Sequence, residues 1–254
     1  MHPLITTVVF DLDDTLYDCY RQRVLAAHRH ACRAMLQGNL RRSRGRPLSL
    51  QRLFRLRLRL FHQERNLETL DRRLCTRLGV GGRTAERLAR IGYEAYFSLP
   101  VGRLRLFPET LPTLQRLHRS GIHLFILTAG HLHTQRAKVR ALGLDQLPYV
   151  RKIFYTGLTQ GRGKTAYLRQ VLRREPNPKR VLVVGDRLDS EIRVARELGM
   201  WTVRRRGGEF ARYQPQHRLE RPHFTISRLS QLFRLGFIFA GAPADQARRG
   251  KSSR

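Results

Sequence analysis

Short, continuous apolar runs alternate with helical patterns through most of this chain, and this alternation constrains the fold more than any other feature. Continuous apolar runs are typical of strands that are buried on both faces. Strands that are separated by helices pair in parallel, so we predict an α/β fold in three layers, a doubly wound parallel sheet between helices. We expect strands at residues 5–10, 123–127, 153–155, 180–184, 201–203 and 224–226, and helices at 108–120, 132–142, 165–174 and 190–198.

Residues 17–105 break this alternation, because the helical patterns at 20–37 and 83–97 have no strand between them. We interpret this region as a helical domain inserted after the first strand, with a loop at 41–47. The end of the chain is small, polar and basic, which is typical of a disordered tail. The predicted domains are an α/β core at 1–16 and 106–240, a helical cap at 17–105 and a tail at 241–254.

The segment 51–65 within the helical region can be read in two ways. Arginine and leucine alternate there with the period of a strand, whereas Leu53, Leu56 and Leu60 recur at helical spacing. Because leucine and arginine are both good helix formers, we expect a helix.

The chain carries 50 basic and 19 acidic residues, which gives a formal net charge of +31. A field of that sign attracts anions of any kind, including phosphorylated metabolites, nucleic acid and anionic lipid. Only five of the basic residues are lysine, so biased codon usage explains the excess of arginine as well as selection for a partner does. The charge therefore leaves nucleic acid open as a partner. The residues that motivate it are Arg52, Arg55, Arg57 and Arg59, for which a solvated helix face is the simpler interpretation.

The cysteines and the hydropathy pattern indicate where in the cell the protein is located. Cys19, Cys32 and Cys75 lack metal-ligand spacing and suggest packing roles in a reducing environment. The apolar run at 4–10 is too short for a secretory signal, and no run reaches the length of a membrane span. We expect a cytoplasmic protein without a membrane partner, and no feature points to a particular oligomeric state.

Acidic residues follow the first apolar run directly, in the order Asp11-Leu12-Asp13-Asp14-Thr15. Buried carboxylates are costly unless they are used or paired, and ligands bind at the carboxyl ends of strands in an open α/β sheet. One carboxylate can attack phosphorus while the other moves a proton, and Mg²⁺ would relieve the repulsion between them. The alternative interpretation is an Asp-rich turn at the end of the strand.

Two weaker signals lie further along the chain. Thr128 and Ala129 end the second expected strand, where a hydroxyl and a small residue let backbone N–H groups approach a phosphoryl oxygen. Lys164 precedes a helix and can neutralise a phosphate as a point charge. Taken singly, Thr128 is more simply a helix N-cap and Lys164 a solvated surface lysine.

A second acidic motif, Gly185-Asp186, ends the expected strand at 180–184. Asp186 is placed to ligate a cation, and Asp189 and Glu191 can hold the metal's water molecules or orient Lys164. Acids are also common in the first turn of a helix, which accounts for Asp189 and Glu191 but not for Asp186. All of these motifs fall at strand carboxyl ends, so we expect them to converge on one edge of the sheet.

This ordered set of motifs resembles the haloacid dehalogenase-like (HAD) superfamily of phosphohydrolases. Residues 8–17 look like its first motif, Thr128 the second, Lys164 the third, and Gly185-Asp186 with the following acids the fourth. The resemblance covers roughly residues 4–235. It implies a HAD-like Rossmannoid core, and the helical insertion is similar to the family's C1-type cap.

The resemblance implies a Mg²⁺-dependent phosphatase that hydrolyses phosphate monoesters of a small phosphorylated metabolite through an aspartyl-phosphate intermediate. Asp11 would be the nucleophile and a metal ligand. Asp13 would donate and accept the proton and also ligate the metal through its backbone carbonyl. Of the other residues, Thr128, Ala129 and Lys164 would bind the phosphoryl group, Asp186 would complete the metal site, and Thr15, Asp189 and Glu191 would support it.

One departure from the family pattern concerns Glu191, because many relatives have aspartate five residues after the motif-four aspartate. Whether Asp189 or Glu191 serves the metal is therefore left open. The acid at Asp13 favours phosphate chemistry, since the dehalogenases of the superfamily lack it. Two alternatives remain: a nucleotide or nucleic-acid phosphatase, and a non-catalytic nucleic-acid-binding protein on the same scaffold.

Overall fold

The computed structural model describes residues 3–40, 48–64, 66–157 and 163–239. The chain divides into two compact units, an α/β unit made of Met1–Tyr20 with Val101–Arg254, and a helical unit made of Arg21–Pro100. The loop expected at 41–47 and the tail expected at 241–254 lie outside the described residues.

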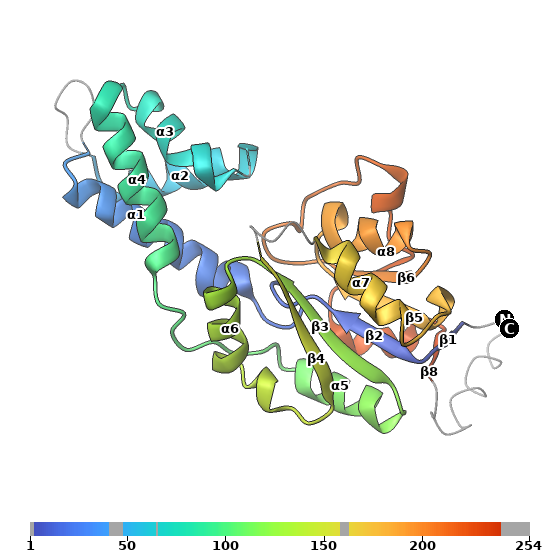
Figure 1. Ribbon diagram of the computed structural model, residues 1–254. Helices are drawn as coiled ribbons and strands as arrows, with labels where there is room; N and C mark the ends of the chain where they lie inside the picture. The colour runs from blue at the N-terminus through green and yellow to red at the C-terminus, as the bar shows by residue number, and fades with distance from the viewer. Residues whose placement is uncertain (1–2, 41–47, 65, 158–162, 240–254) are drawn as a thin grey trace, which may run out of the picture. The chain divides into compact units, whose positions relative to one another are not determined.

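The α/β unit is built on a six-stranded parallel sheet in which β2 lies between β3 and β5 (Figure 1). Its strands carry valine, isoleucine, leucine and phenylalanine on both faces, as the continuous apolar runs predict. The predicted doubly wound α/β fold is confirmed. In spatial order the strands are β4 (Val150–Thr156), β3 (His123–Ala129), β2 (Thr7–Phe10), β5 (Val181–Gly185), β6 (Trp201–Arg205) and β7 (Phe224–Ile226).

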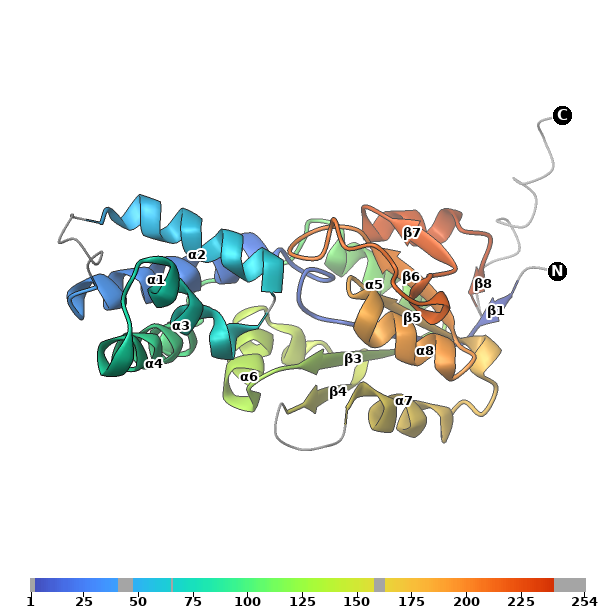
Figure 2. The same ribbon diagram turned by 90° about the horizontal axis from the view of Figure 1, so that it is seen from above.

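The order of the strands reverses direction beside β2. The chain runs outward from β2 through β3 to β4, and then returns to β5 on the other side of β2. Right-handed crossovers in opposite directions place the connecting helices on opposite faces of the sheet. The helices are α5 (Thr110–Arg119) and α6 (Leu132–Ala141) on the outward path, and α7 (Lys164–Leu172) and α8 (Arg193–Glu197) on the return (Figure 2).

The side of the sheet that faces α7 and α8 forms a continuous apolar core. Leu168 and Val171 of α7 and Ala195 of α8 pack there against side chains from the strands. This packing fixes β2 and β5 side by side, so their carboxyl ends form the switch point of the sheet, the place where ligands bind in such folds. The buried members are Val9, Phe125, Leu127, Phe154, Leu168, Val171, Val181, Val183, Ala195 and Met200.

Two expected elements are interrupted in the structure. The strand expected at 5–10 is interrupted at Thr6: β1 (Leu4–Ile5) pairs with β8 (Ile238–Phe239) in a separate two-stranded sheet, and β8 was not expected. The helix expected at 190–198 is regular only in α8, because Ser190 has φ −119° and ψ −106° within the turn Leu188–Ile192. The expected helix thus begins with a kinked turn.

The helical unit contains four α-helices among the described residues, preceded by a π-helical turn at Tyr20–Val24. The segment at 51–65 is a helix, as expected, because Leu53, Leu60 and Phe61 are buried on one of its faces. A helix was missed at Leu67–Arg77, although Asn66 caps it by accepting a hydrogen bond from Glu68 N at 2.9 Å. The helices are α1 (Leu25–Gln37), α2 (Leu50–Glu64), α3 (Leu67–Arg77) and α4 (Gly82–Ser98).

One of the four arginines that motivated nucleic-acid binding is buried. The Arg57 side chain is fully inaccessible, and its guanidinium donates to both carboxylate oxygens of Asp71, at 2.7 and 2.8 Å. It also contacts the ring of His28. Arg57 is therefore part of the helical core and not of a solvated or phosphate-binding face, whereas Arg52, Arg55 and Arg59 are exposed.

None of the described helices combines the length and the apolarity that a bilayer-spanning segment requires. The three cysteines are free thiols, and all of them are buried.

Candidate active site

The acidic ends of β2 and β5 meet at the switch point of the sheet. Phe10 and Val184 are paired in register, and Asp11 N donates to Val184 O at 2.8 Å, which extends the ladder by one residue. Asp11 therefore lies beside the Gly185-Asp186 turn. Thr128 is the penultimate residue of the neighbouring strand β3 and is buried.

A buried lysine joins the acids of the first and fourth motifs. Lys164 Nζ lies 2.7 Å from Asp11 Oδ1 and 2.5 Å from Glu191 Oε2, and its side chain is only 7% exposed. Oxygen atoms of Asp11, Asp186 and Glu191 all lie within 4.8 Å of one another, and all three residues are buried. We call these three residues with Lys164 the carboxylate–lysine cluster. Lys164 is thus not the solvated surface lysine that it resembles when considered alone.

Gly185 makes room for this cluster. A Cβ atom at position 185 would lie 2.4 Å from the Glu191 side chain, closer than van der Waals contact allows. Glu191 also accepts a hydrogen bond from Arg187 N at 2.7 Å, which turns its side chain inward. The kinked turn before α8 and the glycine of the motif together let this acid reach Lys164.

Negative charge exceeds positive charge in the carboxylate–lysine cluster. Burial raises the pKa of Asp11 to about 7, against the lowering effect of Lys164 and with a further rise from Glu191. Burial raises the pKa of Asp186 well above its ordinary value, and repulsion from Glu191 and Asp11 adds to the rise. Three carboxylates around one ammonium therefore cannot all be ionised at low cost without a further cation.

A divalent cation fits this donor set. Hard oxygen ligands without nitrogen or sulfur suit Mg²⁺, and a double positive charge would balance the excess of carboxylate that the raised pKa values express. Asp11, Asp186 and Glu191 are the side chains that could hold it.

The carboxylate of Asp13 belongs to a different group of contacts. It accepts hydrogen bonds from Tyr17 Oη at 2.7 Å, from Lys138 Nζ at 2.8 and 3.0 Å, and from Gln135 Nε2 at 3.2 Å. Burial raises the pKa of Asp13, but the Lys138 ammonium and the hydrogen bonds from Lys138 and Tyr17 outweigh burial and hold it below its ordinary value. Sequence reasoning missed Gln135 and Lys138.

The loop after β2 is held from both sides. Asp14 has a left-handed backbone, with φ 55°, and its carboxylate accepts from Tyr20 N at 2.9 Å and from Glu209 N at 3.1 Å. The Oγ1 atom of Thr15 is buried and has no hydrogen-bond partner among the described residues.

Ala129 is linked to the Asp13 group through its carbonyl, which accepts a hydrogen bond from Gln135 Nε2 at 2.7 Å. Gly130 permits this approach, because a Cβ atom there would lie 2.5 Å from Gln135 Nε2, and its φ of 143° disfavours other residues. Gln135 therefore connects the ends of β2 and β3.

Asp189 and Glu191 have separate partners. Asp189 accepts from the Arg187 guanidinium at 3.2 and 3.0 Å, and that guanidinium lies over the ring of Phe210 at 4.6 Å. Asp189 is not among the acids whose oxygens gather within 4.8 Å, whereas Glu191 is.

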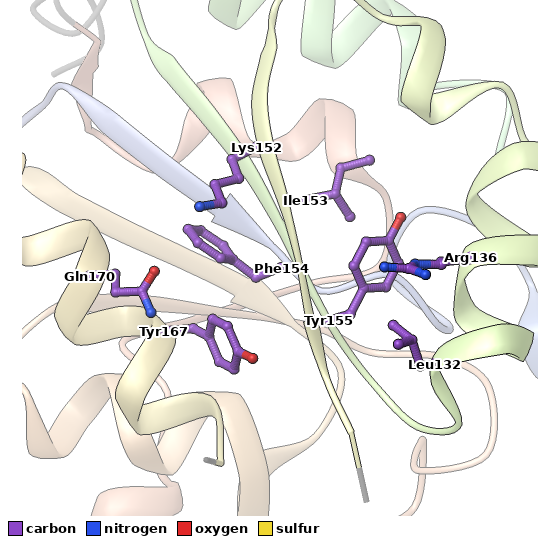
Figure 3. A pocket seen from close by; sticks show the side chains of 8 residues that line it. All are labelled: Leu132, Arg136, Lys152, Ile153, Phe154, Tyr155, Tyr167 and Gln170. Carbon is purple, nitrogen blue, oxygen red and sulfur yellow. The ribbon is translucent and has the colours of Figure 1, made fainter. Parts of the chain in front are cut away.

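Figure 3 shows a different hollow of the α/β unit, which lies along β4 between side chains of α6 and α7. The Arg136 guanidinium lies 5.9 Å from the centre of the Tyr155 ring, and Lys152 Nζ lies 5.2 Å from that of Phe154. The hollow contains none of the predicted site residues, and no acid lines it. Its lining is Leu132, Arg136, Lys152, Ile153, Phe154, Tyr155, Tyr167 and Gln170.

Comparison with known proteins identifies the family of this chain. The family model of the haloacid dehalogenase-like hydrolases matches residues 5–199. The glyceraldehyde 3-phosphate phosphatase of Methanopyrus kandleri is 29% identical over 234 residues, covering 90% of this chain and 96% of that protein. The enzyme of the same name from Methanocaldococcus jannaschii is 28% identical over 232 residues, covering 90% and 96%.

A solved structure has the same fold. The HAD-hydrolase YfnB of Bacillus subtilis, bound to magnesium, aligns with a TM-score of 0.59 at 22% identity, over 92% of this chain and 99% of that one.

A doubly wound sheet with a lysine among the acids at its switch point defines a class of α/β proteins with an acidic ligand site. Within that class, this chain belongs to the haloacid dehalogenase-like hydrolases. The predicted enzyme class, a phosphatase of this family, is confirmed.

Proposed function

We propose that this protein hydrolyses the phosphate monoester of a small metabolite, with Asp11 as the nucleophile and a divalent cation, Mg²⁺, as cofactor. The observation that carries the proposal is the carboxylate–lysine cluster: Lys164 lies 2.7 Å from Asp11, and Asp186 and Glu191 lie beside them. Buried acids that share one ammonium form a preorganised site for a second cation and for a phosphoryl group.

In the first half of the reaction, an Asp11 oxygen forms a bond to phosphorus and the bond from phosphorus to the leaving oxygen breaks. The negative charge of a bound phosphate monoester would raise the pKa of Asp13 and favour its protonated form. Asp13 then gives its proton to the leaving oxygen, so an alcohol departs and an aspartyl-phosphate remains. In the second half, water attacks phosphorus and Asp13 takes its proton. The bond to Asp11 breaks, and inorganic phosphate leaves.

The cations stabilise charge on the phosphoryl oxygens. Lys164 supplies one of them, and Thr128 and Ala129 would contribute a hydroxyl and a backbone N–H from the end of β3. Asp11, Asp186 and the backbone carbonyl of Asp13 would hold the divalent ion, which would supply Lewis-acid stabilisation of the phosphoryl group. Glu191 lies among the gathered acids and Asp189 does not, which favours Glu191 as the carboxylate that supports the metal site.

A small substrate is the better supported class. The curated relatives are named for glyceraldehyde 3-phosphate, a phosphorylated three-carbon compound, which makes triose phosphates the first substrates to test. We propose that the helical unit Arg21–Pro100 is the cap that selects the leaving group. Nucleic acid is less well supported, since Arg57 is buried in an ion pair.

The test is a screen of phosphate monoesters, including triose phosphates, nucleotides and p-nitrophenyl phosphate, with Mg²⁺ or with EDTA. Phosphate release should require Mg²⁺ and favour small phosphates. Reduction of the acid-quenched enzyme with borohydride, followed by mass spectrometry, should locate the acyl-phosphate on Asp11.

The control is Asp11→Asn, which preserves shape and removes the nucleophile. Its activity should fall by about 10⁴-fold or more. Equal activity in Asp11→Asn and the unmodified enzyme would rule out the proposed nucleophile.

A further inference from the structure

Asp13 differs from the other acids of the site in its surroundings. Oxygens of Asp11, Asp186 and Glu191 gather within 4.8 Å of one another, whereas the Asp13 carboxylate is not part of that group. A carboxylate that remained close to such a group would compete for its cation. The contacts of Asp13 explain how it is kept apart.

Both oxygens of Asp13 are held by donors of the α/β unit. Tyr17 and Lys138 donate to Oδ1, at 2.7 and 3.0 Å, and Lys138 and Gln135 donate to Oδ2, at 2.8 and 3.2 Å. Tyr17 is fully buried and Lys138 is 5% exposed, whereas the Asp13 side chain is 29% exposed, so packing fixes these two donors while the carboxylate stays accessible. We call Tyr17, Gln135 and Lys138 the Asp13 clamp.

The identity of residue 138 is informative in this chain. Of 50 basic residues, 45 are arginine and five are lysine. Two of the five, Lys138 and Lys164, are buried against acids of the site. Lysine at these two positions places a compact ammonium on a flexible stem against the acids, whereas a planar guanidinium has a larger and more rigid head group.

We propose that Lys138 is a positioning residue for the proposed reaction: it holds the Asp13 carboxylate out of the carboxylate–lysine cluster and reserves it for proton transfer to the leaving group. Asp11, Asp186 and Glu191 then face the cation, and Asp13 faces the departing oxygen. This inference rests on the proposed function of Asp13. It predicts opposite effects of Lys138 on metal binding and on catalysis.

The experiment compares Lys138→Met with the unmodified enzyme on two substrates and in Mg²⁺ binding. An alkyl phosphate needs a proton donor for its leaving oxygen, whereas p-nitrophenolate leaves readily without one. Lys138→Met should lower kcat by about 100-fold on the alkyl phosphate and by less than about 10-fold on p-nitrophenyl phosphate. Isothermal titration without substrate should show Mg²⁺ bound about 10-fold more tightly, because Asp13 is released and a nearby positive charge is removed.

Three further variants keep the result interpretable. Lys152→Met, at an exposed lysine outside the site, should leave both substrates and Mg²⁺ binding unchanged. Adding Lys138→Met to Asp13→Asn should cause no further loss if Lys138 acts through Asp13. Tyr17→Phe keeps the ion pair and should show the same substrate preference in weaker form, even if Lys138→Met folds poorly.

Equal losses on the two substrates, or weaker Mg²⁺ binding in Lys138→Met, would overturn the inference and leave Lys138 a purely structural role. Failure of the proposed function would look different. In that case Asp11→Asn would retain full activity. The Mg²⁺ titration of Lys138→Met would still report the effect of Lys138 on metal binding, because it does not depend on catalysis.

Discussion

The α/β unit and the helical unit each bury a group of charges, and the two groups are balanced differently. In the helical unit, Arg57 forms a bidentate ion pair with Asp71, so one cation meets one anion. In the α/β unit, Lys164 forms ion pairs with both Asp11 and Glu191, and Asp186 lies beside them. In a balanced group the protein itself neutralises each buried charge, whereas an unbalanced group requires a cation from solution.

The histidine of the helical unit strengthens this contrast. Burial and the neighbouring Arg57 lower the pKa of His28 to about 2, so the ring is neutral and adds no charge to the ion pair. In the carboxylate–lysine cluster, the same physical effect, burial, instead raises the pKa of Asp11 and Asp186. Burial disfavours the charged form in both units, but in the α/β unit the affected groups are acids that also repel one another.

The largest expected effect comes from removing the single cation of the unbalanced group. Lys164→Met should lower kcat/KM by about 10⁴-fold, because this ammonium stabilises charge on the transferred phosphoryl group. The measurement is steady-state phosphate release at saturating Mg²⁺. Lys179→Met removes an exposed lysine at 5.7 Å from the Trp201 ring and should be fully active. A loss below about 10-fold in Lys164→Met would make Lys164 a structural partner like Arg57.

Much of the α/β unit could be predicted from the sequence, because short contiguous segments determine its strands and the position of its acids. Each central strand is a continuous apolar run, and Asp11 and Asp186 directly follow the ends of β2 and β5. The position of Asp11 beside Asp186 then follows from parallel pairing alone. Even Lys164 could be placed, since it begins the helix that follows β4.

The parts that could not be predicted depend on partners distant in sequence. Arg57 lies in an arginine-rich helix that suggests solvent exposure, but its contacts with Asp71 and His28 of other helices make burial tolerable. Lys138 lies in a helix with no strand-end motif, and it contacts an acid 125 residues away. The scarcity of lysine was the one available signal for Lys138, and composition alone does not say which lysines are buried.

The second prediction tests the balanced group. Asp71→Asn leaves Arg57 buried without a counter-charge, which typically costs about 3–5 kcal/mol. Hydrogen exchange of the amides in α2 and α3 should report this loss as faster exchange in the intact protein. The double variant Arg57→Met with Asp71→Leu replaces the pair with apolar groups and should recover most of the loss. If Asp71→Asn exchanged like the unmodified protein, the ion pair would not stabilise the helical unit.

The third prediction concerns pH, with His28 as the reporting group. Unfolded histidine binds a proton below about pH 6.5, whereas folded His28 stays neutral until about pH 2. The unfolded chain therefore binds more protons in this interval, and stability falls as the pH falls below 6.5. From pH 7.5 to 5.0 this one group should cost about 2 kcal/mol. Hydrogen exchange in α1 should show the loss, and His28→Asn should lack this component of it.

The smallest expected effect is an increase in stability, and it separates the two buried groups most clearly. Asp186→Asn makes the same chemical change as Asp71→Asn, but in the group with excess negative charge. Without divalent cations it should stabilise the protein by about 1 kcal/mol, because repulsion from Glu191 and Asp11 is relieved. Mg²⁺ should raise the Tm of the unmodified protein and leave that of Asp186→Asn nearly unchanged. A lower Tm for Asp186→Asn in EDTA would mean that Asp186, like Asp71, stabilises the fold through its charge. The excess of carboxylates in the α/β unit would then not be evidence of a cation site.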